Sequence, residues 1–296
     1  MSEPALTFVI PFFRGLDHLE AAIRSVRAQT VTSWRALVLD DAGPEPESAA
    51  RVAAFDDPRI EHRRNPVNLG LAGNWNQGLE LAGTDLVTIL HADDELEPGY
   101  AAAVLAGHAR HPDAAAVYTQ VTVIGAEGSP VFSFPDYAKR FIERRGQGDT
   151  VVAGEAGLDR LMHGQFIFCP SLCYRRSRVG SGPFDGRWRQ VLDLALLADI
   201  LLAGGELVGV PERVYRYRRH HRSVTAQQTE SLVRFEEELA VFDEIADRAR
   251  ERGWSRAART AAAKRIVRLH LLYRAAGDAL RGRWTAARGK VRLARS

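Results

Sequence analysis

The chain has 296 residues, of which 46% are hydrophobic and 26% charged, an ordinary composition for a globular protein with a large core. Its net charge of +3 is uneven, because the segment from Arg248 to the end holds 15 Lys and Arg against two acids, a charge of +13, which leaves −10 on the rest. A basic surplus confined to one segment argues against nucleic-acid binding by the whole chain.

Apolar runs and helical periodicity alternate through the first ninety residues. Strands are predicted over 5–10, 35–40, 59–64 and 85–90, and helices over 16–29 and 68–83. This order is typical of an α/β fold in which helices cover a mostly parallel sheet. Ligands bind such sheets at the carboxyl ends of the strands, where Pro11, Asp40-Asp41 and Asp93-Asp94 all fall. The sequence thus predicts one site built from three strand ends.

The second half of the chain has weaker signals. Strands are predicted over 113–125 and 164–176, an apolar helix over 188–205, and a short strand with a basic loop over 206–226. From about residue 229 the pattern is helical and rich in Ala and Arg. We therefore expect a domain over 1–228 and a basic helical extension over 229–296.

The two cysteines, Cys169 and Cys173, are too few for a disulfide framework or a zinc site, and in FIFCPSLCY we expect them in a buried strand. The start MSEPALTFVIPFF lacks the features of a signal peptide, and no apolar run reaches the ~18 residues of a membrane span. We therefore expect a reducing, cytoplasmic setting.

The segment TILHADDELEPG places adjacent carboxylates directly after an apolar strand. Adjacent carboxylates repel each other, and paired oxygen ligands of this kind suit Mg²⁺ or Mn²⁺ bound together with substrate phosphates. We therefore expect Asp93 and Asp94 to be metal ligands. A solvated turn, or a helix N-cap before Pro98, is the alternative for these two residues.

The order FVIPFF, then SVRAQTVTSWRALVLDDAG, then DPRIEHRRNPVNLGLAGNWNQGLELAGTDLVTILHADDELEPG resembles the family 2 glycosyltransferases of the GT-A fold. The resemblance is close over residues 5 to about 105 and looser over 165–226. It implies a nucleotide-binding half of about 1–112, an acceptor half of about 113–228, and a nucleotide-diphosphate sugar as the donor.

The resemblance also assigns residues around the nucleotide. Asp93 and Asp94 match the metal site that holds the diphosphate, and His91 stands where the family commonly has the first Asp, so His91, with Ala92 beside it, is expected behind the metal or facing a bound ligand. The remaining matches line the base, the ribose or the helix beneath the nucleotide: Pro11, Arg14, Asp40, Asp41, Gly70 and Asn76. For Arg14 a solvated loop position, and for Gly70 close packing of helix on sheet, are the alternatives.

Asp193 interrupts the apolar helix predicted over 188–205. Burying a carboxylate is costly unless it is paired or functional, and the resemblance matches Asp193 to the family's catalytic base. Pairing with Arg187 or Arg189 is the alternative. Asp199 is a rival acid on the same helix, but six residues further on it should face elsewhere.

The segment YRYRRHHRSVTA, residues 215–226, resembles a loop that closes over the active site in the family. Arg218 and His221, with His220 and Arg222 beside them, would neutralise the departing diphosphate. A merely solvated basic loop is the alternative.

Together these features predict an inverting, metal-dependent glycosyltransferase that acts on a polysaccharide, glycolipid or small-molecule acceptor. A sugar-1-phosphate nucleotidyltransferase is an alternative, although FFRGLDH is a poor version of the glycine-rich loop it needs; a non-catalytic nucleotide-sugar-binding protein is another. The apolar stripe Ile266, Leu269, Leu272 and Tyr273 lies among Lys and Arg, so peripheral contact with the inner face of a membrane is expected as an alternative to simple packing on the domain.

Overall fold

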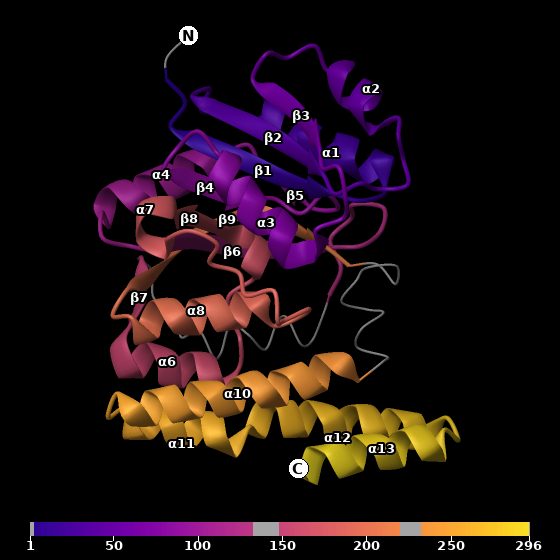
Figure 1. The fold of residues 1–296 in the computed structure, drawn as a ribbon, viewed down its shortest axis with the longest axis vertical. Coiled ribbons are helices and arrows are strands. Elements are labelled where there is room, and N and C mark those ends of the chain that lie inside the picture. Colours follow the sequence, from indigo (N-terminus) through magenta and orange to yellow (C-terminus); the bar gives the residue numbers. More distant parts are fainter. Residues whose placement is uncertain (1–2, 133–147, 220–231, 296) are drawn as a thin grey trace.

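The computed structural model describes residues 3–132, 148–219 and 232–295. Its strands are β1 Leu6–Phe12, β2 Trp34–Asp40, β3 Ile60–Arg64, β4 Leu86–Ile89, β5 Glu95–Leu96, β6 Ala116–Ile124, β7 Thr150–Ala153, β8 Leu172–Arg175 and β9 Glu206–Arg218. They form one sheet in the order β3-β2-β1-β4-β8-β6-β9-β5, with β7 paired to β9 (Figure 1).

Helices cover both faces of this sheet. Those of the first half are α1 Leu16–Arg27, α2 Ser48–Ala53, α3 Gly70–Leu81 and α4 Tyr100–Arg110, and those of the second are α6 Gly154–His163, α7 Arg176–Val179 and α8 Leu192–Leu202. Four further helices close the chain: α10 Val233–Glu251, α11 Ser255–Ala263, α12 Arg265–Leu280 and α13 Trp284–Arg295. None of the described helices is both long and apolar enough to cross a membrane.

Strands β3, β2, β1 and β4 run parallel, as the alternation of strands and helices along the first half predicts. Successive side chains of a strand point to opposite faces, so in β1 Phe8 and Ile10 join the apolar cluster under α1 and α4, whereas Val9 joins the cluster with α3 and α8. The prediction of an α/β fold with a mostly parallel sheet flanked by helices is confirmed.

The second half departs from two of the predicted elements. The strand predicted over 164–176 is only β8, preceded by a 3-10 turn over Cys169–Ser171, so Cys173 lies in a buried strand and Cys169 does not. The strand predicted as short after residue 206 continues to Arg218, and the YRYR segment is therefore strand rather than loop. Its alternating side chains were the signal for this.

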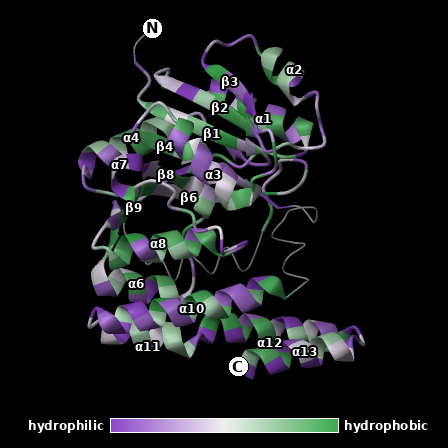
Figure 2. Ribbon diagram, viewed as in Figure 1, coloured by the Kyte–Doolittle hydropathy of each residue, from purple (hydrophilic) through white to green (hydrophobic). Residues whose placement is uncertain are grey.

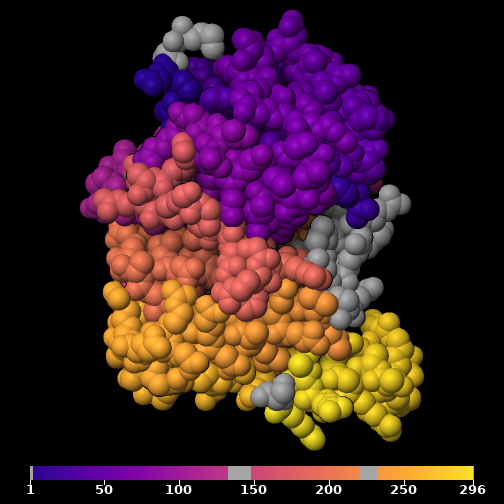
Figure 3. Space-filling model, in the orientation of Figure 1, coloured from indigo at the N-terminus to yellow at the C-terminus, as the bar shows by residue number. Residues whose placement is uncertain are grey.

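The C-terminal helices begin as part of the main core. Phe235, Leu239 and Phe242 of α10 belong to the same apolar cluster as α6 and α8. The last two helices, α12 and α13, lie side by side and form the end of the molecule farthest from β2 and β3 (Figures 1 and 3). The domain boundary expected near residue 228 falls outside the described residues and stays a prediction.

Candidate active site

The parallel strands β1, β2 and β4 end at the same edge of the sheet, and the loop after β4 carries the acidic cluster. Asp94 in this loop is 1% exposed. Its Oδ1 accepts a hydrogen bond from the backbone N–H of Arg218 over 2.7 Å, and its Oδ2 accepts one from the hydroxyl of Tyr215 over 2.9 Å. Burial raises the pKa of Asp94 well above its usual range, and the negative charge of Asp93 raises it further. The hydrogen bonds from Arg218 and Tyr215 and the positive charge of Arg218 act in the opposite direction and lower this pKa.

Three side chains offer ligand atoms to a cation here. One atom each from His91, Asp93 and Asp94 lie within 4.8 Å of one another. His91 packs against Trp75 with ring centroids 5.3 Å apart, and its Nδ1 lies 3.9 Å from Asp94 Oδ2. Within the described part of the chain, His91 Nε2 is a buried nitrogen with no hydrogen-bond partner. The donor set, two carboxylates and an imidazole, fits a divalent cation.

Arg218 organises this loop from the end of β9. Its side chain is almost fully buried: Nε donates to the carbonyl of Asp93 over 2.7 Å, Nη1 donates to that of Ala126 over 2.7 Å, and Nη2 forms an ion pair with Glu95. The guanidinium is bonded to the loop that carries Asp93 and Asp94 and so positions these two residues; its expected contact with a diphosphate stays a prediction. His221, expected beside it, lies outside the described residues.

Asp40 and Asp41, at the end of β2, both accept several internal hydrogen bonds. Asp40 is fully buried and accepts from the N–H of Gly43, the hydroxyl of Ser48 and the guanidinium of Arg64 at 2.6–2.8 Å. Because Asp40 exposes no surface, a nucleotide contact from its carboxylate would have to replace one of these bonds.

Asp41 shapes the neighbouring turn into α3. Its carboxylate accepts from Asn65 Nδ2 over 3.0 Å and from the backbone N–H groups of Leu69 and Gly70 over 2.8 and 3.0 Å. Gly70 has a positive φ of 73°, a conformation that favours glycine, and a Cβ there would meet nothing within 4 Å. Backbone conformation, rather than close packing, therefore accounts for this glycine.

Three other residues singled out in the sequence flank this region. Pro11 is half-buried in β1, and Arg14 is exposed in the turn that follows. Asn76 of α3 exchanges two hydrogen bonds with the backbone of Phe184, at 2.8 and 2.9 Å, so its side chain holds a loop from the second half against α3.

Asp193 lies in the first turn of α8, because the helix begins at Leu192 and not at 188 as expected. Asp193 is therefore half-buried, while the leucines around it are buried. Gln165 Nε2 donates to its Oδ2 over 2.5 Å, and a helix N-terminus favours a negative charge. Arg187, one of the arginines considered as a partner, pairs with Asp185 and Glu244.

His91 lies close enough to Asp193 and to Asp93 for both charges to act on it. Burial lowers the pKa of His91, and the charges of both Asp93 and Asp193 oppose that shift. Burial raises the pKa of the Cys169 thiol well above its usual range, and the charges of Asp193 and Asp94 add to this effect. The charge of Asp193 and that of an acid after β4 both shift the pKa of His91 and that of Cys169. These carboxylates therefore lie near the same end of the sheet.

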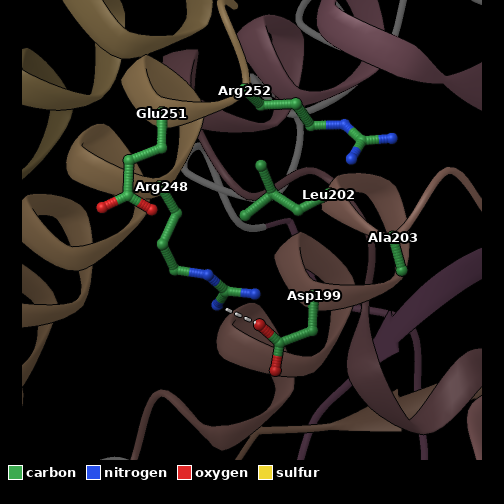
Figure 4. Close-up of a pocket in the computed structure, with 6 residues that line it drawn as sticks. All are labelled: Asp199, Leu202, Ala203, Arg248, Glu251 and Arg252. Carbon is green, nitrogen blue, oxygen red and sulfur yellow. Dashed lines mark hydrogen bonds and ion pairs between the residues drawn. The ribbon is translucent and has the colours of Figure 1, made fainter.

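Asp199, the rival acid, belongs to a different surface. It forms an ion pair with Arg248 of α10, in a cleft between the two helices (Figure 4). The residues that line this cleft are Asp199, Leu202, Ala203, Arg248, Glu251 and Arg252. The expectation that Asp199 faces away from Asp193 is confirmed.

Three residues of the site escaped the sequence reasoning: Trp75, Gln165 and Tyr215. Trp75 packs against both His91 and Phe184, and its place beside Asn76 in the expected helix was its one signal. Tyr215 belongs to the alternating sequence YRYR. This alternation is typical of a strand and could have predicted that the Tyr215 side chain points to one face of the sheet. Nothing in the sequence around Gln165 indicates its bond to Asp193.

Three comparisons show which known proteins this chain is similar to. The model of the family described as "Glycosyl transferase family 2" matches residues 7–163. A putative colanic acid biosynthesis glycosyl transferase, WcaA of Escherichia coli K12, is 26% identical over 190 residues, which cover 64% of this chain and 59% of the relative. WfgD of Escherichia coli, a UDP-Glc:α-D-GlcNAc-diphosphoundecaprenol β-1,3-glucosyltransferase, is 30% identical over 94 residues, 32% of this chain and 37% of the relative. The chain thus spans less than two thirds of the length of each of these relatives.

Solved structures show the same fold. The structure of S. aureus TarS 1–349 matches with a TM-score of 0.66 at 13% identity, covering 98% of this chain and 80% of that one. A structure of the same fragment in complex with UDP-GlcNAc matches with a TM-score of 0.60 at 13% identity, covering 98% and 91%. The GT-A-type arrangement expected from the sequence is confirmed.

Proposed function

This chain belongs to glycosyl transferase family 2, and we propose that it transfers a sugar from a nucleotide-diphosphate sugar to an acceptor hydroxyl with inversion at the anomeric carbon. The observation that carries the proposal is that the charge of Asp193 acts on His91, a member of the cluster with Asp93 and Asp94 at the end of the sheet. The first supplies a base, and the second supplies a place for the charge of a diphosphate.

In this mechanism Asp193 accepts the proton of the acceptor hydroxyl. The hydroxyl oxygen forms its bond to the anomeric carbon on the face opposite the diphosphate, and the bond from that carbon to the diphosphate oxygen breaks. Gln165, bonded to Oδ2 of Asp193, orients the carboxylate. Mg²⁺ or Mn²⁺ held by Asp93 and Asp94, with His91 beside them, would supply positive charge for the departing diphosphate.

The surrounding residues would place the donor. We propose that the following residues lie around the nucleotide at or near the strand ends: Pro11, Arg14, Asp40, Asp41, Gly70, Asn76 and Ala92. His221 stays a proposed diphosphate contact. Arg218 acts indirectly by fixing the loop that carries Asp93 and Asp94.

The acceptor is proposed to be a glycan or a lipid-linked sugar. Relatives named for colanic acid biosynthesis and for diphosphoundecaprenol-linked sugars support this class. We propose a cytoplasmic protein that meets such acceptors by peripheral contact with the inner face of the membrane.

The donor is the first thing to measure. Purified protein should be screened by thermal shift against UDP-, GDP- and dTDP-sugars with Mn²⁺ or Mg²⁺, and release of nucleoside diphosphate should be followed for each donor that binds. We expect sugars of one nucleotide class to stabilise the protein. We also expect the protein to hydrolyse these donors slowly when no acceptor is present. Binding without consumption, with any acceptor offered, would favour a non-catalytic nucleotide-sugar-binding protein.

A further inference from the structure

The helix α12 carries an exposed apolar stripe at helical spacing. Its members are Ile266, Leu269, Tyr273 and Leu280, and Trp284 continues the stripe at the start of α13. Leu269 is 63% exposed, Tyr273 75%, Leu280 90% and Trp284 62%. Large apolar side chains gathered on one exposed face mark an interaction surface in soluble proteins.

This stripe is separate from the face that α12 uses for packing. Val267, Leu271 and Ala275 are buried, and they follow their own helical spacing on the other side of the helix. The helix is therefore apolar on two faces, of which the fold covers one. Figure 2 shows hydrophobic residues on α12 beside hydrophilic ones, at the end of the molecule.

The charge of the same two helices is almost entirely positive. Residues 265–295 hold nine Lys and Arg and a single acid, Asp278. Asp278 is buried and accepts from Lys290 and Arg283 over 2.6 Å each. The exposed charges are thus arginines on the same two helices as the stripe: Arg265, Arg281, Arg283, Arg288, Arg292 and Arg295.

We infer that the α12–α13 hairpin lies on an anionic lipid surface. In this arrangement Leu269, Tyr273 and Trp284 enter the boundary between headgroups and acyl chains, while the flanking arginines meet lipid phosphates. The charge selects an anionic surface over a neutral one, and it also argues against a second copy of this equally basic hairpin. This inference rests on the membrane contact in the proposed function and names the surface and the lipid charge that make it, and it needs no residue of the active site.

Sedimentation of the full chain with vesicles tests the inference. Vesicles of phosphatidylcholine alone should recover little protein, and vesicles that also contain phosphatidylglycerol should recover most of it, with the binding weakened by salt. The variant Leu269→Ser/Tyr273→Ser/Trp284→Ser should lower the partition coefficient on the order of tenfold or more. Because these side chains are exposed, its thermal unfolding should match that of the wild type.

Two comparisons sharpen the result. Phe132→Ser changes a 78% exposed side chain outside the hairpin and should bind as the wild type does. Arg281→Gln/Arg288→Gln/Arg292→Gln should lose the preference for anionic vesicles.

Equal recovery with both vesicle types would overturn the inference, as would unchanged binding of the apolar variant. Ultracentrifugation that showed a dimer abolished by the apolar variant, without vesicle binding, would identify a second copy as the occupant. Asp193→Asn should bind vesicles normally, so failure of the proposed chemistry would remain distinguishable.

Discussion

The hydroxyl of Tyr215 donates a hydrogen bond over 2.9 Å to Oδ2 of Asp94, a residue 121 positions earlier in the chain. Together with the N–H of Arg218 it satisfies both oxygens of a carboxylate that is buried beside a second negative charge. The end of β9 therefore fixes the position of the acidic loop through these two hydrogen bonds.

Tyr215→Phe tests this relationship. The substitution removes only the hydroxyl from a fully buried ring and leaves one oxygen of a buried carboxylate with a lost partner, which typically costs about 1–3 kcal/mol. Urea unfolding should show that loss. Tyr273→Phe, on an exposed tyrosine, is the matched control. Equal unfolding free energies for the two variants would mean that the bond contributes nothing.

Asp93→Asn tests the proposed cation site. Asp93 is half-buried, unlike Asp94, so its substitution is the less disruptive of the two. Loss of a direct ligand should weaken metal-dependent nucleotide binding by at least about 10–100-fold, the range known for residues that only support ligands. Calorimetric titration of nucleotide with Mn²⁺ and with EDTA measures this. If the nucleotide affinity were the same with Mn²⁺ and with EDTA, nucleotide binding would not depend on a metal ion.

His108 predicts a loss of stability in mild acid. This buried histidine bonds through Nε2 to the carbonyl of Cys173, and burial lowers its pKa from 6.5 to about 4. Between pH 6.5 and about 4, His108 is therefore protonated in the unfolded chain but stays neutral in the folded protein. The free energy of unfolding should therefore fall as the pH drops from about 6.5 to about 4, by up to about 3 kcal/mol from this residue.

Urea unfolding at several pH values checks this. His108→Gln should flatten the dependence in that window, whereas His163→Gln, on an exposed side chain, should not. Curves of the same slope for wild type and His108→Gln would show that His108 is not the group responsible.

The sequence predicted the part of the site that depends on local pattern. Continuous apolar strands such as 35–40 are buried on both faces, so their polar ends are expected at one edge of the sheet, and the parallel strands that precede Asp41 and Asp93 do end at one edge. The order of those motifs also identified the family. No structure was needed for either step.

The residues that complete the site depend on contacts across the chain. The basic residues of YRYR favour a loop in the sequence, but the segment pairs with β6 over Val121–Ile124 and is therefore a strand. This strand places Tyr215 and Arg218 beside Asp94. Gln165 reaches Asp193 only because the predicted strand 164–176 is mostly irregular there. Periodicity contains no information about such long-range pairs.

The turnover of Asp193→Asn, compared with that of Asp199→Asn, decides whether Asp193 is the base of a glycosyl transfer. Asparagine keeps volume and hydrogen bonding but cannot accept the proton, and general-base catalysis is typically worth about 10²–10⁴-fold. We predict that Asp193→Asn lowers kcat by that factor with donor binding and thermal stability unchanged. Asp199→Asn, which breaks a half-exposed ion pair with Arg248, should keep most activity. Equal turnover of the two variants, or a loss of folding rather than of kcat in Asp193→Asn, would contradict the account.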